Sequence, residues 1–125
     1  MNQTIRLKCD RFSFFRMYLR LLSNGKPLSD LRNKEIDALA AIMERNDIIA
    51  SDFKDPEDPK KWSLVFSYEG KQMMAERSGQ PEASFANSLT SLRKIGIVDD
   101  ITLNPTFRIY PKDINELKFV FHVGG

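Results

Sequence analysis

Cysteine and histidine are almost absent from this sequence, which contains Cys9 and His122 and no other residue of either type. A single cysteine forms no disulfide within the chain, and one cysteine with one histidine falls short of the four ligands of a structural zinc site. The glycine-rich phosphate loop and the Gly-x-Ser-x-Gly turn of hydrolases are also missing. The sequence therefore predicts a protein that is not an enzyme, uses no metal or cofactor and works in a reducing compartment, the cytoplasm.

One catalytic alternative stays open at this point. Strands are predicted at both ends of the chain, and if they lie together they could bring Cys9 and His122 into a Cys–His pair. Against this pair, Cys9 belongs to an alternating apolar segment, where a structural thiol is commoner than a reactive one.

Long apolar runs are missing as well, since none approaches the roughly 20 residues that span a bilayer. The most apolar stretch, FSFFRMYLRLL, is interrupted by Arg16 and Arg20, so neither a membrane span nor a secretory signal is expected. With 125 residues, 42% of them apolar, the chain has the size and composition of one domain with a substantial core.

Charge is distributed unevenly along the chain. Residues 1–26 contain six basic residues and one acidic residue, whereas residues 27–60 contain five basic and nine acidic residues. We divide the sequence into a basic, aromatic extension over 1–27 and a domain over 28–125. The extension predicts a contact with an anionic partner through Arg16 and Arg20, one helical turn apart; the alternative is a solvated helix face.

Hydrophobic periodicity predicts an α+β fold. The acidic loop over 51–61 has neither the spacing nor the glycine of a calcium-binding EF-hand loop. The elements expected are a strand over 5–9, a helix over 11–23 capped by Asp10, a helix from an Asn33 cap to about 46–48, a short strand or apolar segment over 62–66, a helix over 68–78 capped by Ser67, a helix over 81–95, a hairpin over 97–103 turning at Asp99–Asp100, and a strand over 117–123.

The helix over 81–95 has two contrasting stripes. Phe85, Leu89 and Leu92 recur at helical spacing and predict the buried side. The other stripe is small, uncharged and able to form hydrogen bonds, and we expect it to face outward and allow close approach of a partner; it consists of Ser84, Asn87, Ser88 and Ser91.

The order of helix, helix, glycine turn, helix and hairpin over about 30–110 resembles the winged-helix family. The segment LRKIGIV, residues 92–98, is similar to the end of that family's recognition helix running into its first wing strand. The chain with its aromatic N-terminal extension is also similar to small winged-helix proteins encoded by bacteriophages.

The resemblance implies a recognition helix in the major groove of double-stranded DNA and a β-wing over the backbone. Carried over to this sequence, the DNA-binding residues are Ser84, Asn87, Ser88 and Ser91 toward the bases, Arg93 and Lys94 near phosphate, and Arg108 on or after the wing, with Arg16 and Arg20 in support. The expected role is that of an accessory protein in transcription or replication.

The sequence departs from the usual DNA-binding pattern in its charges. The first three turns of the helix over 81–95 lack Arg and Lys, and Glu82, Asp99 and Asp100 add negative charge nearby. Since phosphate contacts supply much of the affinity for DNA, protein–protein assembly remains the alternative, for example in a phage virion or a homodimer. Neither a membrane nor a small-molecule partner is expected.

Overall fold

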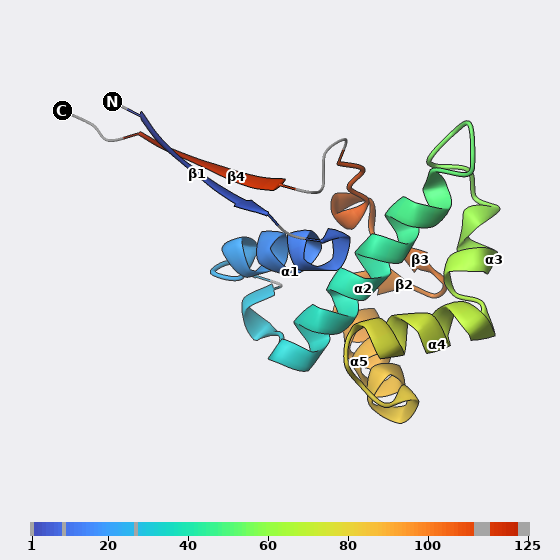
Figure 1. Cartoon of the computed structure of the whole chain (residues 1–125). Helices are drawn as coiled ribbons and strands as arrows, with labels where there is room; N and C mark the ends of the chain where they lie inside the picture. The colour runs from blue at the N-terminus through green and yellow to red at the C-terminus, as the bar shows by residue number, and fades with distance from the viewer. Residues whose placement is uncertain (1, 9, 27, 112–115, 123–125) are drawn as a thin grey trace.

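The computed structural model describes residues 2–8, 10–26, 28–111 and 116–122, and only the backbone of 2–8 and 116–122. Within these ranges the protein is α+β, with five α-helices and two antiparallel two-stranded sheets (Figure 1). Cys9 and Val123, both assigned to strands from the sequence, lie outside the described residues. The elements are β1 (Asn2–Lys8), α1 (Arg11–Leu22), α2 (Asn33–Ala50), α3 (Lys61–Val65), α4 (Tyr68–Arg77), α5 (Glu82–Lys94), β2 (Val98–Asp99), β3 (Thr102–Leu103) and β4 (Glu116–His122), with short 3₁₀ turns at Leu28–Asp30 and Pro105–Phe107.

Side-chain caps begin two of the helices where the sequence predicts them. The Asp10 carboxylate accepts a hydrogen bond from the Ser13 backbone N–H at 2.7 Å, at the start of α1. The Ser67 hydroxyl accepts one from the Gly70 N–H at 3.0 Å, at the start of α4. Each cap satisfies a backbone donor that the first helical turn leaves without an intrahelical partner.

The start and end of α2 differ from the sequence prediction. Asn33 is not the cap but the first residue of the helix, and the Glu35 carboxylate instead accepts a hydrogen bond from the Arg32 backbone N–H at 2.8 Å. The helix continues to Ala50, past the predicted end near residues 46–48. Ala50 is buried, so tertiary packing extends the helix beyond its local stop signals.

Of the two alternatives predicted over 62–66, the short strand is wrong, because Lys61–Val65 form the helix α3, and the segment is apolar and largely buried. Trp62, Val65 and Phe66 are buried while the residues between them are exposed, which is a helical spacing rather than an alternation. In so short an apolar run the two periods are hard to distinguish, and packing against α2 decides the outcome.

A turn containing Gly79 joins α4 to α5 as predicted, but it has four residues, 78–81, rather than the predicted three. Gly79 adopts a left-handed φ of 70°, and the Gln80 N–H donates to the Ala75 carbonyl at 3.0 Å, which closes the end of α4. Pro81 follows directly before α5. The turn fixes α5 at an angle to α4 (Figure 1).

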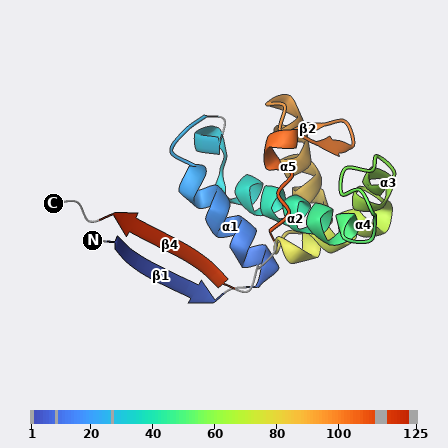
Figure 2. The same ribbon diagram turned by 90° about the horizontal axis from the view of Figure 1, so that it is seen from above.

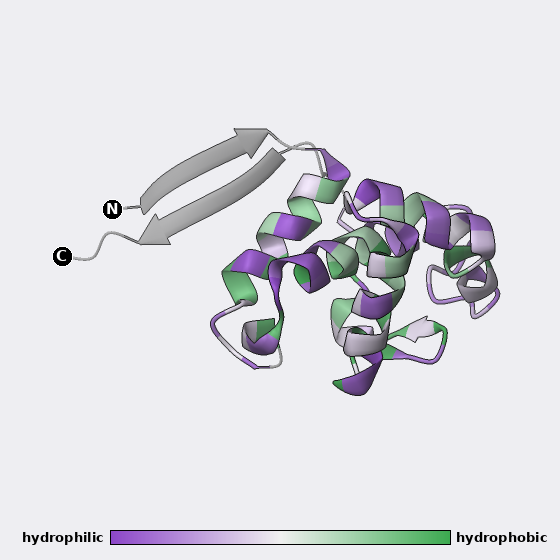
Figure 3. Ribbon diagram, turned by 90° about the horizontal axis from the view of Figure 1, so that it is seen from below, coloured by the Kyte–Doolittle hydropathy of each residue, from purple (hydrophilic) through white to green (hydrophobic). Residues whose placement is uncertain are grey.

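The core is a single cluster with α2 at its centre. Leu39, Ile42 and Met43 have no exposed surface, and Ala38 and Ala40 on the same helix are also fully buried. On one side of α2 lies α1, which contributes Phe15 and Leu19 to the same cluster, while α4 and α5 lie on another side (Figure 2). Hydrophilic residues lie on the outer surfaces of the helices (Figure 3).

The predicted hairpin over 97–103 is present, with strands of only two residues each. Val98 pairs with Leu103 and Asp99 with Thr102, and the chain turns at Asp100, whose φ is 53°. The strands near the two ends of the chain pair with each other, from Lys8 opposite Glu116 to Asn2 opposite His122. This second sheet extends away from the helices in both views (Figures 1 and 2).

Candidate nucleic-acid interface

The buried side of α5 is the one that the sequence predicts. Phe85, Leu89 and Leu92 are exposed by 2%, 3% and 0%, and all three belong to the core cluster. Their burial fixes the rotation of the helix about its axis.

The expectation that Ser88 faces outward is wrong. Ser88 is only 5% exposed, and its hydroxyl donates to the Gln80 side-chain oxygen at 3.2 Å. Half-buried Ser84 donates to the same oxygen at 3.1 Å, and the Gln80 amide donates to the Lys34 carbonyl at 2.7 Å. Through Gln80, Ser84 and Ser88 connect α5 to the preceding turn and to α2. The surface packed against these two serines therefore belongs to the same protein and not to a partner.

Ser91 and Asn87 complete the predicted stripe, and they differ in exposure. Half-buried Ser91 donates to the Asn87 carbonyl at 3.2 Å. Burial raises the pKa of Glu35, but the hydrogen bond from the Arg32 backbone N–H, the nearby Ser91 hydroxyl and the positive charge of Arg32 outweigh that effect and lower the pKa. Ser91 therefore lies beside a charged carboxylate, whereas the Asn87 side chain is exposed.

The exposed side of α5 is centred on Ala83, Asn87, Thr90 and Lys94, which we call the α5 outer stripe. Their separations of four, three and four residues place them along one line of the helix. Sequence reasoning missed Ala83 and Thr90 because it chose as the outward stripe the run of serine and asparagine residues at helical spacing, Ser84, Asn87, Ser88 and Ser91. The available signal was their position opposite Phe85, Leu89 and Leu92.

A groove of about 410 Å³ lies between α5 and the start of α2. Arg32 and Lys34 supply positive charge to this groove, and both are exposed. Arg32 also pairs with Glu35 at 3.5 Å, but its side chain remains 85% exposed. The sequence gives no local signal for these cations, because they lie about 50 residues before α5. The groove is lined by Arg32, Asn33, Lys34, Ser84, Asn87 and Ser88.

A second groove, of about 270 Å³, lies along the other side of α5, against α4. Lys71 and Arg93 border it, and both are exposed. Glu82 also borders it and accepts a hydrogen bond from the Gln72 amide at 3.1 Å. The α5 outer stripe thus has basic side chains on both sides.

No protein-family model, curated protein or solved structure matches this chain.

The β2–β3 hairpin contributes little positive charge beside α5. Asp99 at the end of β2 and Asp100 in the following turn are both exposed. Arg93 donates through Nε to the Asp100 carbonyl at 3.1 Å, which ties the end of α5 to this turn. Lys94, one residue on, is exposed.

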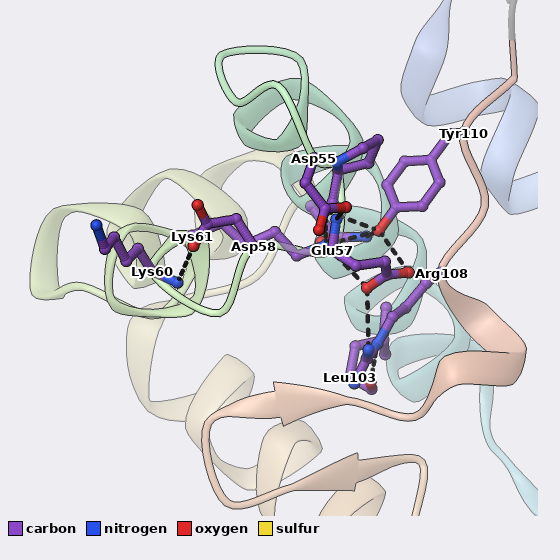
Figure 4. A network of polar contacts seen from close by, with 10 residues as sticks. Asp55, Glu57, Asp58, Lys60, Lys61, Leu103, Arg108 and Tyr110 are labelled. Atoms are coloured by element: carbon purple, nitrogen blue, oxygen red, sulfur yellow. Dashed lines mark hydrogen bonds and ion pairs between the residues drawn. The ribbon is translucent and has the colours of Figure 1, made fainter.

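Arg108 lies after the β2–β3 hairpin, as expected, and is held in the protein's own polar network. It donates through Nε to the Leu103 carbonyl at 2.7 Å and through Nη1 to the Glu57 carboxylate at 3.0 Å (Figure 4). Glu57 also accepts from the Tyr110 hydroxyl at 3.2 Å and lies 3.5 Å from Lys61 Nζ. The acidic loop therefore neutralises Arg108.

Lys61 is the buried member of this network, with no exposed surface. Its ammonium donates to the Tyr110 hydroxyl at 2.6 Å and lies 4.5 Å from the centre of the Trp62 ring. Burial lowers the pKa of Lys61, and the Glu57 carboxylate opposes this effect. The network joins the loop before α3 to the chain after β3 and leaves its cations enclosed.

Arg16 and Arg20 of α1 differ in whether an acidic side chain of the protein balances their charge. Arg16 Nε lies 2.9 Å from the Asp37 carboxylate of α2, so much of its charge is balanced within the fold. Arg20 is exposed on the same helix. The Arg16 side chain is still 43% exposed, so both arginines remain accessible, with the charge of Arg16 partly balanced by Asp37.

The Cys–His alternative depends on Cys9, which lies outside the described residues, so it stays a prediction. His122 lies opposite Asn2 in the terminal strands. Among the described residues no cluster of His, Cys, Asp and Glu could hold a metal ion, and no helix is long and apolar enough to cross a bilayer.

Proposed function

We propose that the protein binds double-stranded DNA through the α5 outer stripe, in the manner of a winged-helix protein. The supporting arrangement is α2, α4, a glycine-containing turn, α5 and the β2–β3 hairpin, in the order that the family uses. In this proposal α5 enters the major groove and the protein acts as an accessory factor in transcription or replication.

The observation that carries the proposal is a slender helix face, uncharged except for Lys94 at its end, with cations along both sides. Ala83, Asn87 and Thr90 project little from α5, so DNA bases could approach the helix closely. Arg32 and Lys34 border one side, and Lys71 and Arg93 border the other. A recognition helix in a major groove has phosphate backbones on both sides, which this charge distribution complements.

The individual roles follow from side-chain chemistry. Asn87 offers an amide that pairs in two places with the edge of adenine, and Thr90 offers a hydroxyl and a methyl group. Arg32, Lys34, Lys71 and Lys94 bind phosphate and set the position of the helix. Glu82, Asp99 and Asp100 limit the affinity by repelling phosphate. Because the attraction comes from lysine and arginine contacts with phosphate, binding is expected to weaken as salt is raised.

A titration of random-sequence duplex DNA at two salt concentrations tests this proposal. We expect Lys34→Glu and Lys94→Glu each to weaken binding and to flatten the salt dependence by about one unit of slope or more. Lys54→Glu is the matched control, because Lys54 is exposed on the acidic loop. Equal effects of all three variants, or no duplex binding at low salt, would refute the proposal.

A second candidate function, protein–protein binding, is favoured by one observation on another side of the molecule. Ile48, Leu64 and Met73 are exposed by 43%, 47% and 54%. Arg45 links them, since it donates to the Leu64 carbonyl at 2.9 Å and contacts the Met73 sulfur at 3.6 Å. We call these three residues the apolar patch. Binding to a protein through it would leave α5 variants without effect and would be lost in Met73→Glu.

A further inference from the structure

The two strands β1 and β4 form a ribbon, the terminal ribbon, that has no third strand in the described part of the chain. A two-stranded ribbon is only marginally stable in water, and three or more strands with an apolar face are usually needed. Both outer edges of the ribbon also carry backbone donors and acceptors without a strand partner. The ribbon extends away from the helices (Figures 1 and 2), so its own helical body does not supply the missing strand.

The register of the ribbon sorts its residues into two faces. Residues directly opposite one another share a face, and faces alternate along each strand. Ile5 pairs with Phe119 and Leu7 with Leu117, so one face is almost entirely apolar. That face consists of Gln3, Ile5, Leu7, Leu117, Phe119 and Phe121, and the residues of the other face are mostly polar.

The sequence of β4 is complementary to itself in antiparallel pairing. A twofold axis at Phe119 places Leu117 opposite Phe121 of a second copy. The same axis places Glu116 opposite His122 of the second copy, which joins an acidic residue to a basic one. Aromatic, aliphatic and opposite-charge pairs of this kind stabilise neighbouring strands.

The faces are preserved by the same symmetry. An axis through one residue pairs odd-numbered positions with odd-numbered positions, so the apolar residues of both copies stay on one side of the sheet. We call the line along which strands of the two copies would pair the seam. The outer edge of β1 is less suited to form it, because Arg6 and Lys8 place two cations within this short strand.

We propose that the protein forms a homodimer in which β4 pairs with β4 of a second copy, in the order β1–β4–β4–β1. The resulting sheet has four strands and one continuous apolar face. The seam is separate from the α5 outer stripe, so the dimer and DNA binding can be tested independently.

Cysteine cross-linking tests the seam directly. With Cys9→Ser as background, Phe119→Cys places two thiols opposite each other, within the reach of a disulfide. Val120→Cys is the control, because residue 120 faces residue 118 of the second copy and the two new thiols lie too far apart. We expect mild oxidation to give a covalent dimer for Phe119→Cys and none for Val120→Cys. Equal cross-linking of the two, or none in either, would overturn the proposal.

Sedimentation equilibrium of the full-length chain gives a second test. His122→Glu sets two carboxylates opposite each other at both ends of the seam and should raise the dimer Kd about tenfold. Asn2→Glu places the same charge opposite residue 122 within the ribbon but on the outer strand, and should leave the Kd within about twofold. A wild-type monomer at high micromolar concentration would overturn the dimer but leave α5-dependent DNA binding intact. If Asn2→Glu lowers the dimer Kd and His122→Glu leaves it unchanged, the two copies pair through β1 instead, and the proposal is overturned.

Discussion

Asn87 and Ser88 are consecutive on α5, yet the Asn87 side chain is exposed while Ser88 is buried and donates to Gln80. This difference separates two roles that sequence reasoning had merged. Ser88 belongs to the contact between α5 and the rest of the fold, and Asn87 belongs to the surface. A comparison of the two positions therefore distinguishes packing from recognition.

Asn87→Ala and Ser88→Ala should have opposite profiles. We expect Asn87→Ala to lose about 1–3 kcal/mol of discrimination between DNA sequences and to change the free energy of unfolding by less than about 0.5 kcal/mol. Ser88→Ala should lose about 0.5–1.5 kcal/mol of stability, because a buried hydrogen bond is removed. Duplexes selected from a random pool and urea unfolding provide the two measurements. If Asn87→Ala lowers the stability of the protein and leaves DNA binding unchanged, Asn87 does not belong to the DNA interface.

Leu89→Ala tests the buried side of α5. Leu89 is 3% exposed, so the substitution should leave a cavity and cost about 2–5 kcal/mol in urea unfolding. Thr90→Ala, one residue on and exposed, is the matched control and should stay within about 0.5 kcal/mol of the wild type. Similar losses in both would mean that α5 is rotated from the position described.

Gly70→Ala should destabilise the protein although alanine normally favours a helix. A Cβ at position 70 would lie 2.5 Å from the Val65 carbonyl oxygen and 2.9 Å from that of Leu64. We expect a loss of about 1–3 kcal/mol, since α3 and α4 would have to move apart. At Gly25 a Cβ meets nothing within 4 Å, so Gly25→Ala is the control and should be nearly neutral. Thermal unfolding of both variants measures the difference, and a stabilised Gly70→Ala would contradict the close packing of α3 on α4.

Lys61 gives a prediction for alkaline pH. Its pKa in the folded protein is lowered by burial, so the unfolded chain binds more protons between that pKa and the ordinary lysine value. Its contribution to stability therefore rises as the pH increases through this window. Burial also raises the pKa of Tyr110, which acts in the opposite direction.

Comparison with Lys61→Met isolates the lysine from Tyr110. The stability of the wild type relative to Lys61→Met should rise as the pH increases toward the ordinary lysine pKa of about 10.4, as measured by urea unfolding. Lys61→Ala should be less stable than Lys61→Met by about 1 kcal/mol or more, because it also leaves a cavity. A stability difference that does not change with pH would show that Lys61 is solvated.

The sequence was informative where the signal is local. Asp10, Ser67 and Gly79 act through backbone groups within a few residues, and each marks its helix end in the structure as predicted. The core stripe of α5 was predictable for the same reason, because its period depends on the helix alone. The hairpin was also predictable from Gly96 and Asp100, although Asp99, expected in the turn, is the last residue of β2.

The side-chain partners of the candidate site could not be predicted, since they come from distant parts of the chain. Arg108 and Glu57 form an ion pair across 51 residues, which removes a cation that the sequence offered to DNA. Ser88 is buried because of where α2 packs, and Arg32 and Lys34 reach the α5 groove for the same reason. Such contacts depend on tertiary packing, which short-range periodicity does not encode.

The most direct test of the DNA-binding account is a map of backbone amide NMR shifts during titration with a random-sequence duplex. We predict that the largest changes fall on Ala83, Asn87, Thr90 and Lys94, with smaller changes at Arg32 and Lys34, and that all of them diminish as salt is raised. Unchanged amides throughout α5, or changes confined to the apolar patch at Ile48, Leu64 and Met73, would contradict the account.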